Sequence, residues 1–294
     1  MSSGASQDET AAQRQADILQ ALKAREVPHL VRARLRGATE GTLPWTATLT
    51  PAELLLARNH GLKPIAAVSA TCWMHYGCSW TLGHSQGWRT ALRRLKDEAR
   101  AAGANAVLDV KMRTVPLAVE DSMDFSLLGT AVRLDGVPAS DDPIVATVPA
   151  LEFIRLLQSD VVPTGIAVGA HYEWLSDFLG STDLTWFGNV ENSVLTRFWR
   201  QVRRQAHKDL RANARKHGNG VLAHVNFSQM FEREGKPKQY LARHIMVATT
   251  VDARRCAHLP EAQIALDLHA GATPLTRRSP HHQSYASNEQ EGAI

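Results

Sequence analysis

The fold is decided by residues 95–110, which read LKDEARAAGANAVLDV. Upstream of the glycine, apolar residues recur at helical spacing and form one stripe of an amphipathic helix: Leu92, Leu95, Ala99 and Ala102. Gly103 supplies the left-handed cap at which such a helix ends. The run Asn105–Val110 that follows is β-like. This stretch therefore predicts a long helix that packs on a sheet and leads into one of its strands.

The same pattern occurs a second time, with a period of about 100 residues. The second helix carries its apolar stripe at Phe198, Val202, Ala206 and Leu210 and ends at Gly218, and residues 219–225 then read as a strand. The flanking elements match as well. Short helices are predicted to start at Thr50-Pro51 and Val148-Pro149, first strands at 64–70 and 163–170, and last strands at 125–132 and 244–251. Four matches in the same order indicate a tandem repeat.

We therefore predict an α+β protein with two tandem β-α-β-β modules. Each module is a small antiparallel sheet covered by one long helix, with a short helix before it. The predicted organisation is an N-terminal arm at 1–44, modules at 45–138 and 147–255, and a C-terminal segment at 256–294. That segment ends in a polar tail, from Thr273, which has too few apolar residues to offset the entropy of ordering and should be disordered.

Composition excludes several classes of protein. With 294 residues, 44% of them hydrophobic, and a formal net charge of +4, the chain is neither a collagen-like fibre nor wholly disordered. No apolar run reaches the ~18–20 residues of a membrane span, and the polar start lacks a signal peptide. The three cysteines are an odd number, which favours a reducing compartment over a disulfide framework. We expect a cytoplasmic protein without a transmembrane segment.

The first module resembles the YbjQ-like family, whose members are described as heavy-metal-binding domain proteins. The resemblance rests on Leu95, Ala99 and the string Gly103-Ala104-Asn105-Ala106-Val107, followed by Gly129-Thr130-Ala131-Val132. The second module is divergent, with 218–221 one residue short of the family string and Ala248-Thr249-Thr250-Val251 in place of the last one. The resemblance covers about residues 45–254.

This resemblance implies a β-α-β-β fold and assembly into rings, typically pentamers, but it implies no known reaction. The physics agrees with self-association, because a sheet of about three strands has edges that a neighbouring copy would cover. We expect a ring-like homo-oligomer that forms through sheet edges and exposed apolar faces.

The strongest local metal signal is Cys72-x-x-His75-x-x-Cys78, with His84 six residues further on. Thiolate and imidazole are the ligands that zinc and copper prefer. Against a site, Cys72 continues a predicted strand and would then be a small buried hydrophobe, on the opposite face from His75. The second module has His171-Tyr172-Glu173 at the matching place and no cysteine there.

A hydrolase motif is also present. Gly83-His84-Ser85-Gln86-Gly87 fits the G-x-S-x-G nucleophile elbow, in which Ser85 would be exposed at a strained turn between a strand and a helix that starts near Trp88. The context is unfavourable, because there is no oxyanion segment upstream and no alternation of strands and helices typical of a parallel sheet. Catalysis by Ser85 remains an alternative function.

The second long helix is strongly basic. Five cations recur at three- and four-residue steps opposite its apolar stripe, and they could bind phosphate of nucleic acid or of anionic lipid: Arg200, Arg204, Lys208, Arg211 and Arg215. A solvated outer helix face is the simpler interpretation, because no base-stacking aromatic platform accompanies the charge. An adaptor for nucleic acid or membrane is thus a second alternative.

No P-loop, dinucleotide-binding fingerprint, EF-hand loop or His-Glu-x-x-His string is present. The sequence therefore favours a non-enzymatic binding or scaffold protein, metal-responsive and able to hold zinc or copper, over an enzyme.

Overall fold

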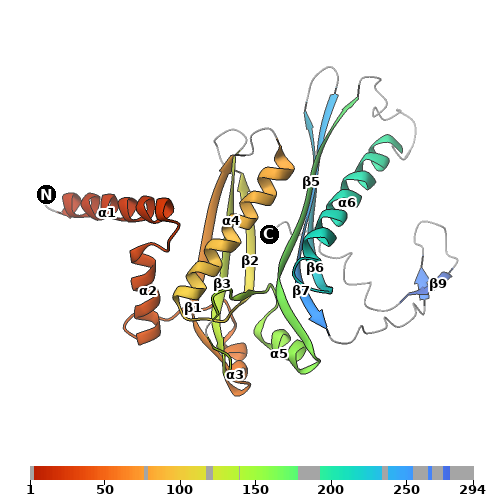
Figure 1. Cartoon of the computed structure of the whole chain (residues 1–294). Helices are drawn as coiled ribbons and strands as arrows, with labels where there is room; N and C mark the ends of the chain where they lie inside the picture. Colours follow the sequence, from red (N-terminus) through yellow and green to blue (C-terminus); the bar gives the residue numbers. More distant parts are fainter. Residues whose placement is uncertain are drawn as a thin grey trace.

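The computed structural model describes residues 3–75, 79–116, 122–138, 140–177, 193–233, 238–253, 264–266 and 274–278. The fold is α+β, as predicted, and contains two units with the same order of elements (Figure 1). In each unit a short helix precedes a strand, a long helix and two further strands. The long helix of each unit lies across one face of its own antiparallel sheet.

The first unit consists of α3 (Pro51–Asn59), β1 (Leu62–His75), α4 (Trp80–Ala101), β2 (Ala106–Pro116) and β3 (Ser122–Leu134). Its sheet has the order β1-β3-β2-β4, where β4 (Ile144–Val145) comes from the segment that leads into the second unit. Helix α3 begins with a capping box, in which Thr50 and Glu53 each accept a hydrogen bond from the other's backbone N–H. Helix α4 begins at Trp80 rather than near Trp88, because Ser79 caps it by accepting from Leu82 N.

The second unit consists of α5 (Ala150–Gln158), β5 (Val161–Asp177), α6 (Ser193–Ala214), β6 (Gly220–Arg233) and β7 (Lys238–Ala253). Its sheet has the order β5-β7-β6, the same as β1-β3-β2 in the first unit. The predicted apolar stripe of α6 is buried against this sheet.

The remaining described elements lie at the two ends of the chain. The arm forms α1 (Ser3–Ala24) and α2 (His29–Glu40), and Leu35 of α2 is buried in the core of the first unit. At the other end β8 (Ile264–Leu266) pairs with β9 (Pro274–Arg278), and the rest of the predicted disordered tail lies outside the described residues. None of the helices in the described ranges combines the length and apolar character needed to cross a bilayer.

Two pairs of threonines hold corresponding positions in the two units. The hydroxyls of Thr48 and Thr130 are 2.8 Å apart, as are those of Thr147 and Thr249. In each pair the hydroxyl on the central strand also accepts from the backbone N–H of the first threonine. Each bond fastens the segment before the short helix to the central strand of its own sheet.

Helix α4 runs between the two sheets and packs on both. One buried cluster contains Leu95 and Ala99 of α4 together with Val68 of β1, and it extends to Ile166 and Val247 of the second sheet. The opposite face of the second sheet packs on α6. The order of layers is thus sheet, α4, sheet, α6, with α6 on the outside (Figure 1).

Polar side chains of each long helix satisfy the backbone of the nearest edge strand. On β1, Ser69 N donates to Glu98 Oε2 (3.1 Å) and Thr71 O accepts from Arg94 (2.6 Å). On β5, Ala170 N donates to Asp209 Oδ2 (3.1 Å) and Val168 O accepts from Asn213 (2.8 Å). An edge strand whose N–H and C=O groups are occupied in this way is a poor template for another strand.

Gly169 of β5 lies against the backbone of α6, and this contact generates a stability prediction. A Cβ at Gly169 would lie 2.4 Å from Ala206 O and 2.5 Å from Leu210 N, which are backbone atoms of a packed helix. We expect Gly169→Ala to lower the free energy of unfolding by about 1–3 kcal/mol or more. Gly165→Ala is the matched control, because its Cβ would meet only Thr250 Oγ1, at 3.6 Å. Urea denaturation of both variants tests the difference, and equal stabilities would contradict this packing.

Candidate functional site

Three of the four residues of the predicted metal set are described, two of them in β1 and His84 in α4. His84 lies in the second turn of α4 and is fully buried. Its Nε2 accepts a hydrogen bond from Trp88 Nε1 (2.8 Å), and its Nδ1 lies 3.0 Å from the Tyr172 hydroxyl of β5. Because an indole can only donate, Nε2 must carry the lone pair, and the proton of the neutral ring belongs on Nδ1.

The surroundings of His84 keep its ring neutral. Burial, together with the nearby charge of Arg243, lowers the pKa of His84 to about 3. Trp88 and Phe125 both meet the imidazole edge to face, with the Phe125 ring centroid at 5.1 Å. His84 thus joins the two units as a polar group inside an aromatic cluster, and both of its nitrogens have protein partners.

Cys72 lies on the inner face of β1, where it is 3% exposed and belongs to the same core cluster as Trp88 and Phe125. Burial raises the pKa of the Cys72 thiol, which disfavours the thiolate that binds metals. His75 is exposed at the end of β1, three residues further, and so lies on the opposite face of the strand. Cys78 lies outside the described residues.

The structure therefore does not bring the described members of this set to one point. Cys72 and His84 both lie beside Phe125 in the core, whereas His75 faces outward. Within the described ranges, no group of three or more His, Cys, Asp and Glu side chains could hold a metal ion. The four-residue ligand set remains a prediction, since one of its members is not described.

Ser85 lies within α4 rather than at a turn between a strand and a helix. Its hydroxyl is 3.5 Å from Arg89 Nη2, one helical turn away, and its carbonyl accepts from Arg89 Nε (3.3 Å). Gly87 is needed for packing, because a Cβ there would lie 2.2 Å from the Phe125 ring. Gly87 of the G-x-S-x-G string thus reflects close packing of α4 on its sheet.

The five cations of the predicted anion-binding face lie together on the outer side of α6: Arg200, Arg204, Lys208, Arg211 and Arg215. All are exposed, and none forms an ion pair with another described residue. Asp209, the acid of this helix, is directed instead to the β5 backbone. The outer face of α6 is therefore basic and solvated.

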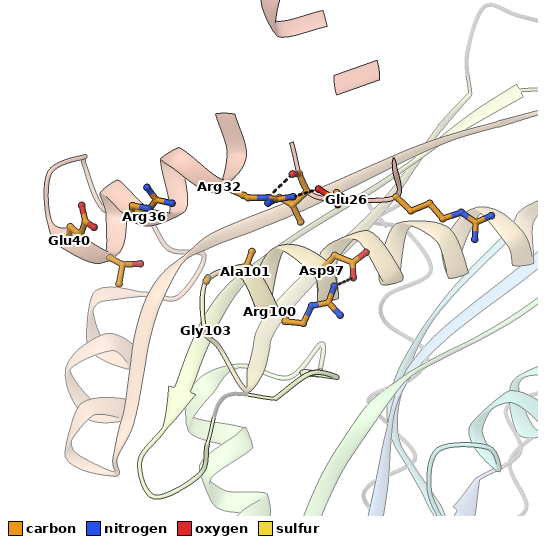
Figure 2. Close-up of a pocket in the computed structure, with 12 residues that line it drawn as sticks. Glu26, Arg32, Arg36, Glu40, Asp97, Arg100, Ala101 and Gly103 are labelled. Atoms are coloured by element: carbon orange, nitrogen blue, oxygen red, sulfur yellow. Dashed lines mark hydrogen bonds and ion pairs between the residues drawn. The ribbon is translucent and has the colours of Figure 1, made fainter. Parts of the chain in front are cut away.

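A cavity of about 610 Å³ lies between the arm and the C-terminal end of α4 (Figure 2). Charged side chains of both signs line it. Arg32 pairs with Glu26 at 2.6 Å, and Arg100 pairs with Asp97 at 3.0 Å. Because these carboxylates are already engaged by arginines, the cavity offers no ready set of metal ligands.

Sequence reasoning missed the buried group formed by His84, Trp88 and Tyr172. The spacing of His84 and Trp88, one helical turn apart, is visible in the sequence. Their partner is 88 positions from His84 along the chain, however, and only the packing of the second unit on the first brings it near.

A comparison with family models matches residues 80–135, from the start of α4 to the end of β3, to the YbjQ-like family described as "putative heavy-metal-binding". The match lies within the first unit. No curated protein matches the chain, and no solved structure does. The match to this family supports a metal ion as a ligand in general, without naming the metal or the residues that hold it.

The buried His84 of the first unit generates a prediction about pH. The unfolded chain takes up a proton near the ordinary histidine pKa of 6.5, whereas folded His84 accepts one only near pH 3. Stability is therefore full above about pH 6.5 and falls as the pH drops, by about 1.4 kcal/mol per pH unit for this group. Between pH 7 and 5 the unmodified protein should lose about 2 kcal/mol more than His84→Gln, whose amide keeps one acceptor and one donor.

Urea denaturation at the two pH values measures this difference. Tyr172→Phe is the companion variant, because it removes the phenol beside Nδ1 but keeps the ring, and should cost about 1 kcal/mol at pH 7. An identical pH dependence in His84→Gln and the unmodified protein would show that folding does not shift the pKa of His84.

Proposed function

We propose that this protein is a non-enzymatic binding and scaffold protein of the heavy-metal-binding type, built from two YbjQ-like units that self-associate. The observation that carries the proposal is the family match over α4, β2 and β3. Residues 147–255 support a second unit of the same kind, because the Thr147–Thr249 bond and the strand order repeat those of the first unit. A cytoplasmic location is part of the proposal and rests on the odd number of cysteines.

A binding role fits the chemistry of the candidate groups better than catalysis. His84 has a lowered pKa, but both of its nitrogens have partners, one on its own helix (Trp88) and one in the second unit (Tyr172). Ser85 contacts Arg89 of its own helix instead of a histidine base. The alternatives of a Ser85 hydrolase and of an adaptor for nucleic acid or anionic lipid gain no support from the family match.

For the metal, the described geometry argues against the two buried members of the predicted set, Cys72 and His84. Cys72 is a buried thiol, and His84 would have to give up two hydrogen bonds to bind an ion. His75 is exposed at the end of β1, three positions before Cys78. We propose that zinc or copper, if held by this set, is bound by His75 and Cys78 with further ligands from outside it.

Elemental analysis of natively purified, untagged protein tests the metal proposal. We expect near-stoichiometric zinc or copper, which His75→Ala/Cys78→Ser loses and Cys72→Ala retains. The control variant Cys72→Ala leaves the exposed end of β1 intact and removes only a buried thiol. Metal lost with Cys72→Ala but kept by the double variant would place the ion in the core instead. Protein that holds no metal and cannot be loaded would overturn the metal part of the proposal.

A further inference from the structure

The contact between the two units of the chain shows which surface of one unit docks on which surface of the other. The segment before α5 adds to the β2 edge of the first unit, where Ile144 N donates to Asn105 O (3.1 Å) and Ala146 N to Val107 O (2.9 Å). One face of the second sheet then packs on α4. The second unit thus docks through an edge segment and a sheet face.

The strand registers allow the two units to be compared residue by residue. Pro64 lies opposite Val132 on β3, as Pro163 lies opposite Val251 on β7, and both pairings continue past one bulge. The sheet residues Trp73 and Leu128 therefore correspond to Tyr172 and Val247. By the same reasoning Leu55 of α3 corresponds to Ile154 of α5, because each lies seven residues before its strand.

Corresponding residues differ sharply in exposure. In the second unit these positions are buried in the contact with the first unit, with Tyr172 8%, Val247 4% and Ile154 7% exposed. In the first unit the same positions carry large apolar side chains that remain open, with Trp73 63%, Leu128 45% and Leu55 70% exposed. The first unit thus presents, uncovered, the surface that the second unit uses for docking. We name Trp73, Leu128 and Leu55 the leading surface.

The edge segment is also present in front of the first unit. Residues 44–49 read PWTATL, and residues 143–148 read PIVATV. Thr48 anchors the first segment to Thr130 in the way that Thr147 anchors the second to Thr249. Both segments are thus anchored to the central strand of the following unit, and Trp45, the counterpart of Ile144, is 42% exposed.

The second unit also has an open strand edge of the kind that receives an edge segment in the first unit. Strand β6 lies at the edge of its sheet: it pairs with β7 on one side, and no described strand pairs with its other side. Asn219 and Val221 correspond to Asn105 and Val107, the residues whose carbonyls receive the edge segment. Val221 is 42% exposed, whereas Val107 is fully buried.

Helix α6 completes this receiving side as α4 does within the chain. Glu98 of α4 bonds Ser69 on β1, and Asn213 of α6 bonds Val168, the corresponding residue of β5. Asn213 therefore corresponds to Glu98, and Trp199 corresponds to His84. The guanidinium of Arg203 lies 5.5 Å from the Trp199 ring. An arginine and an indole on one helix face suit an aromatic side chain such as Trp73. We name Val221 and Trp199 the trailing surface.

We propose that copies of this protein associate head to tail, with the leading surface of one copy docked on the trailing surface of the next. The contact repeats the one between the two units of a single chain. This inference deepens the self-association in the proposed function by naming its surfaces. Because the two surfaces differ, the interface is heterologous, and it joins copies into a closed ring or an open filament.

Sedimentation velocity of two complementary variants tests the proposal. Leu55→Asp/Trp73→Asp removes the leading surface, and Val221→Asp/Trp199→Asp removes the trailing surface. We expect the unmodified protein to sediment as an assembly of more than two chains and each variant alone as one chain. An equimolar mixture should give a species of two chains, because one intact surface of each kind remains. The control is Leu19→Asp, which changes a residue of α1 that is 50% exposed, and this variant should assemble normally.

An unmodified protein that stays a single chain across a wide concentration range would overturn the proposal. So would variants that assemble as well as the control, or a mixture that forms no two-chain species, which would indicate a self-complementary contact elsewhere. Circular dichroism and urea denaturation confirm that each variant is folded. Metal analysis of the single-chain variants distinguishes failure of the assembly proposal from failure of the metal proposal. A variant that binds metal but does not assemble would show that metal binding does not depend on assembly.

Discussion

Helix α4 packs against a sheet on each side, and the two faces of this helix constrain everything around it. Its inner stripe of small and aliphatic residues fits the first sheet closely enough that Gly87 has no room for a Cβ. Its outer side buries an imidazole, which is tolerated only because Trp88 and Tyr172 satisfy both nitrogens. The hydrogen bond to Tyr172 spans the two units, so the docking of the second unit completes the core of the first.

The contrast between the two long helices follows from their positions in the layers. Helix α4 is covered on both sides and carries glycine and aromatic residues where it meets the sheets. Helix α6 is covered on one side only, and cations occupy the positions that face solvent. Helix α4 also carries cations, but Arg89, Arg93 and Arg100 are exposed, so these charges lie outside its contacts with the two sheets.

Much of the fold could be predicted because its signals are local. Helical spacing, the glycine caps and the repeated order of elements are properties of neighbouring residues, and they led to the correct fold class. The start of α4 is harder to predict, because its first two turns contain Gly83 and Gly87, and glycine is unfavourable inside a helix. The candidate site was harder, because the surroundings of Cys72 and His84 depend on residues far away in sequence. A strand places Cys72 and His75 on opposite faces, so their spacing alone overstated their proximity.

The bonds from each long helix to its neighbouring edge strand have a consequence for partly unfolded states. Glu98 and Arg94 occupy backbone groups of β1, while Asp209 and Asn213 do so on β5. When a helix detaches from its sheet, the apolar face and the bonding edge of that sheet become accessible together. A chain in that state is prone to aggregate, because both features attract other chains. Retention of the two helices thus protects the protein during folding and under thermal stress.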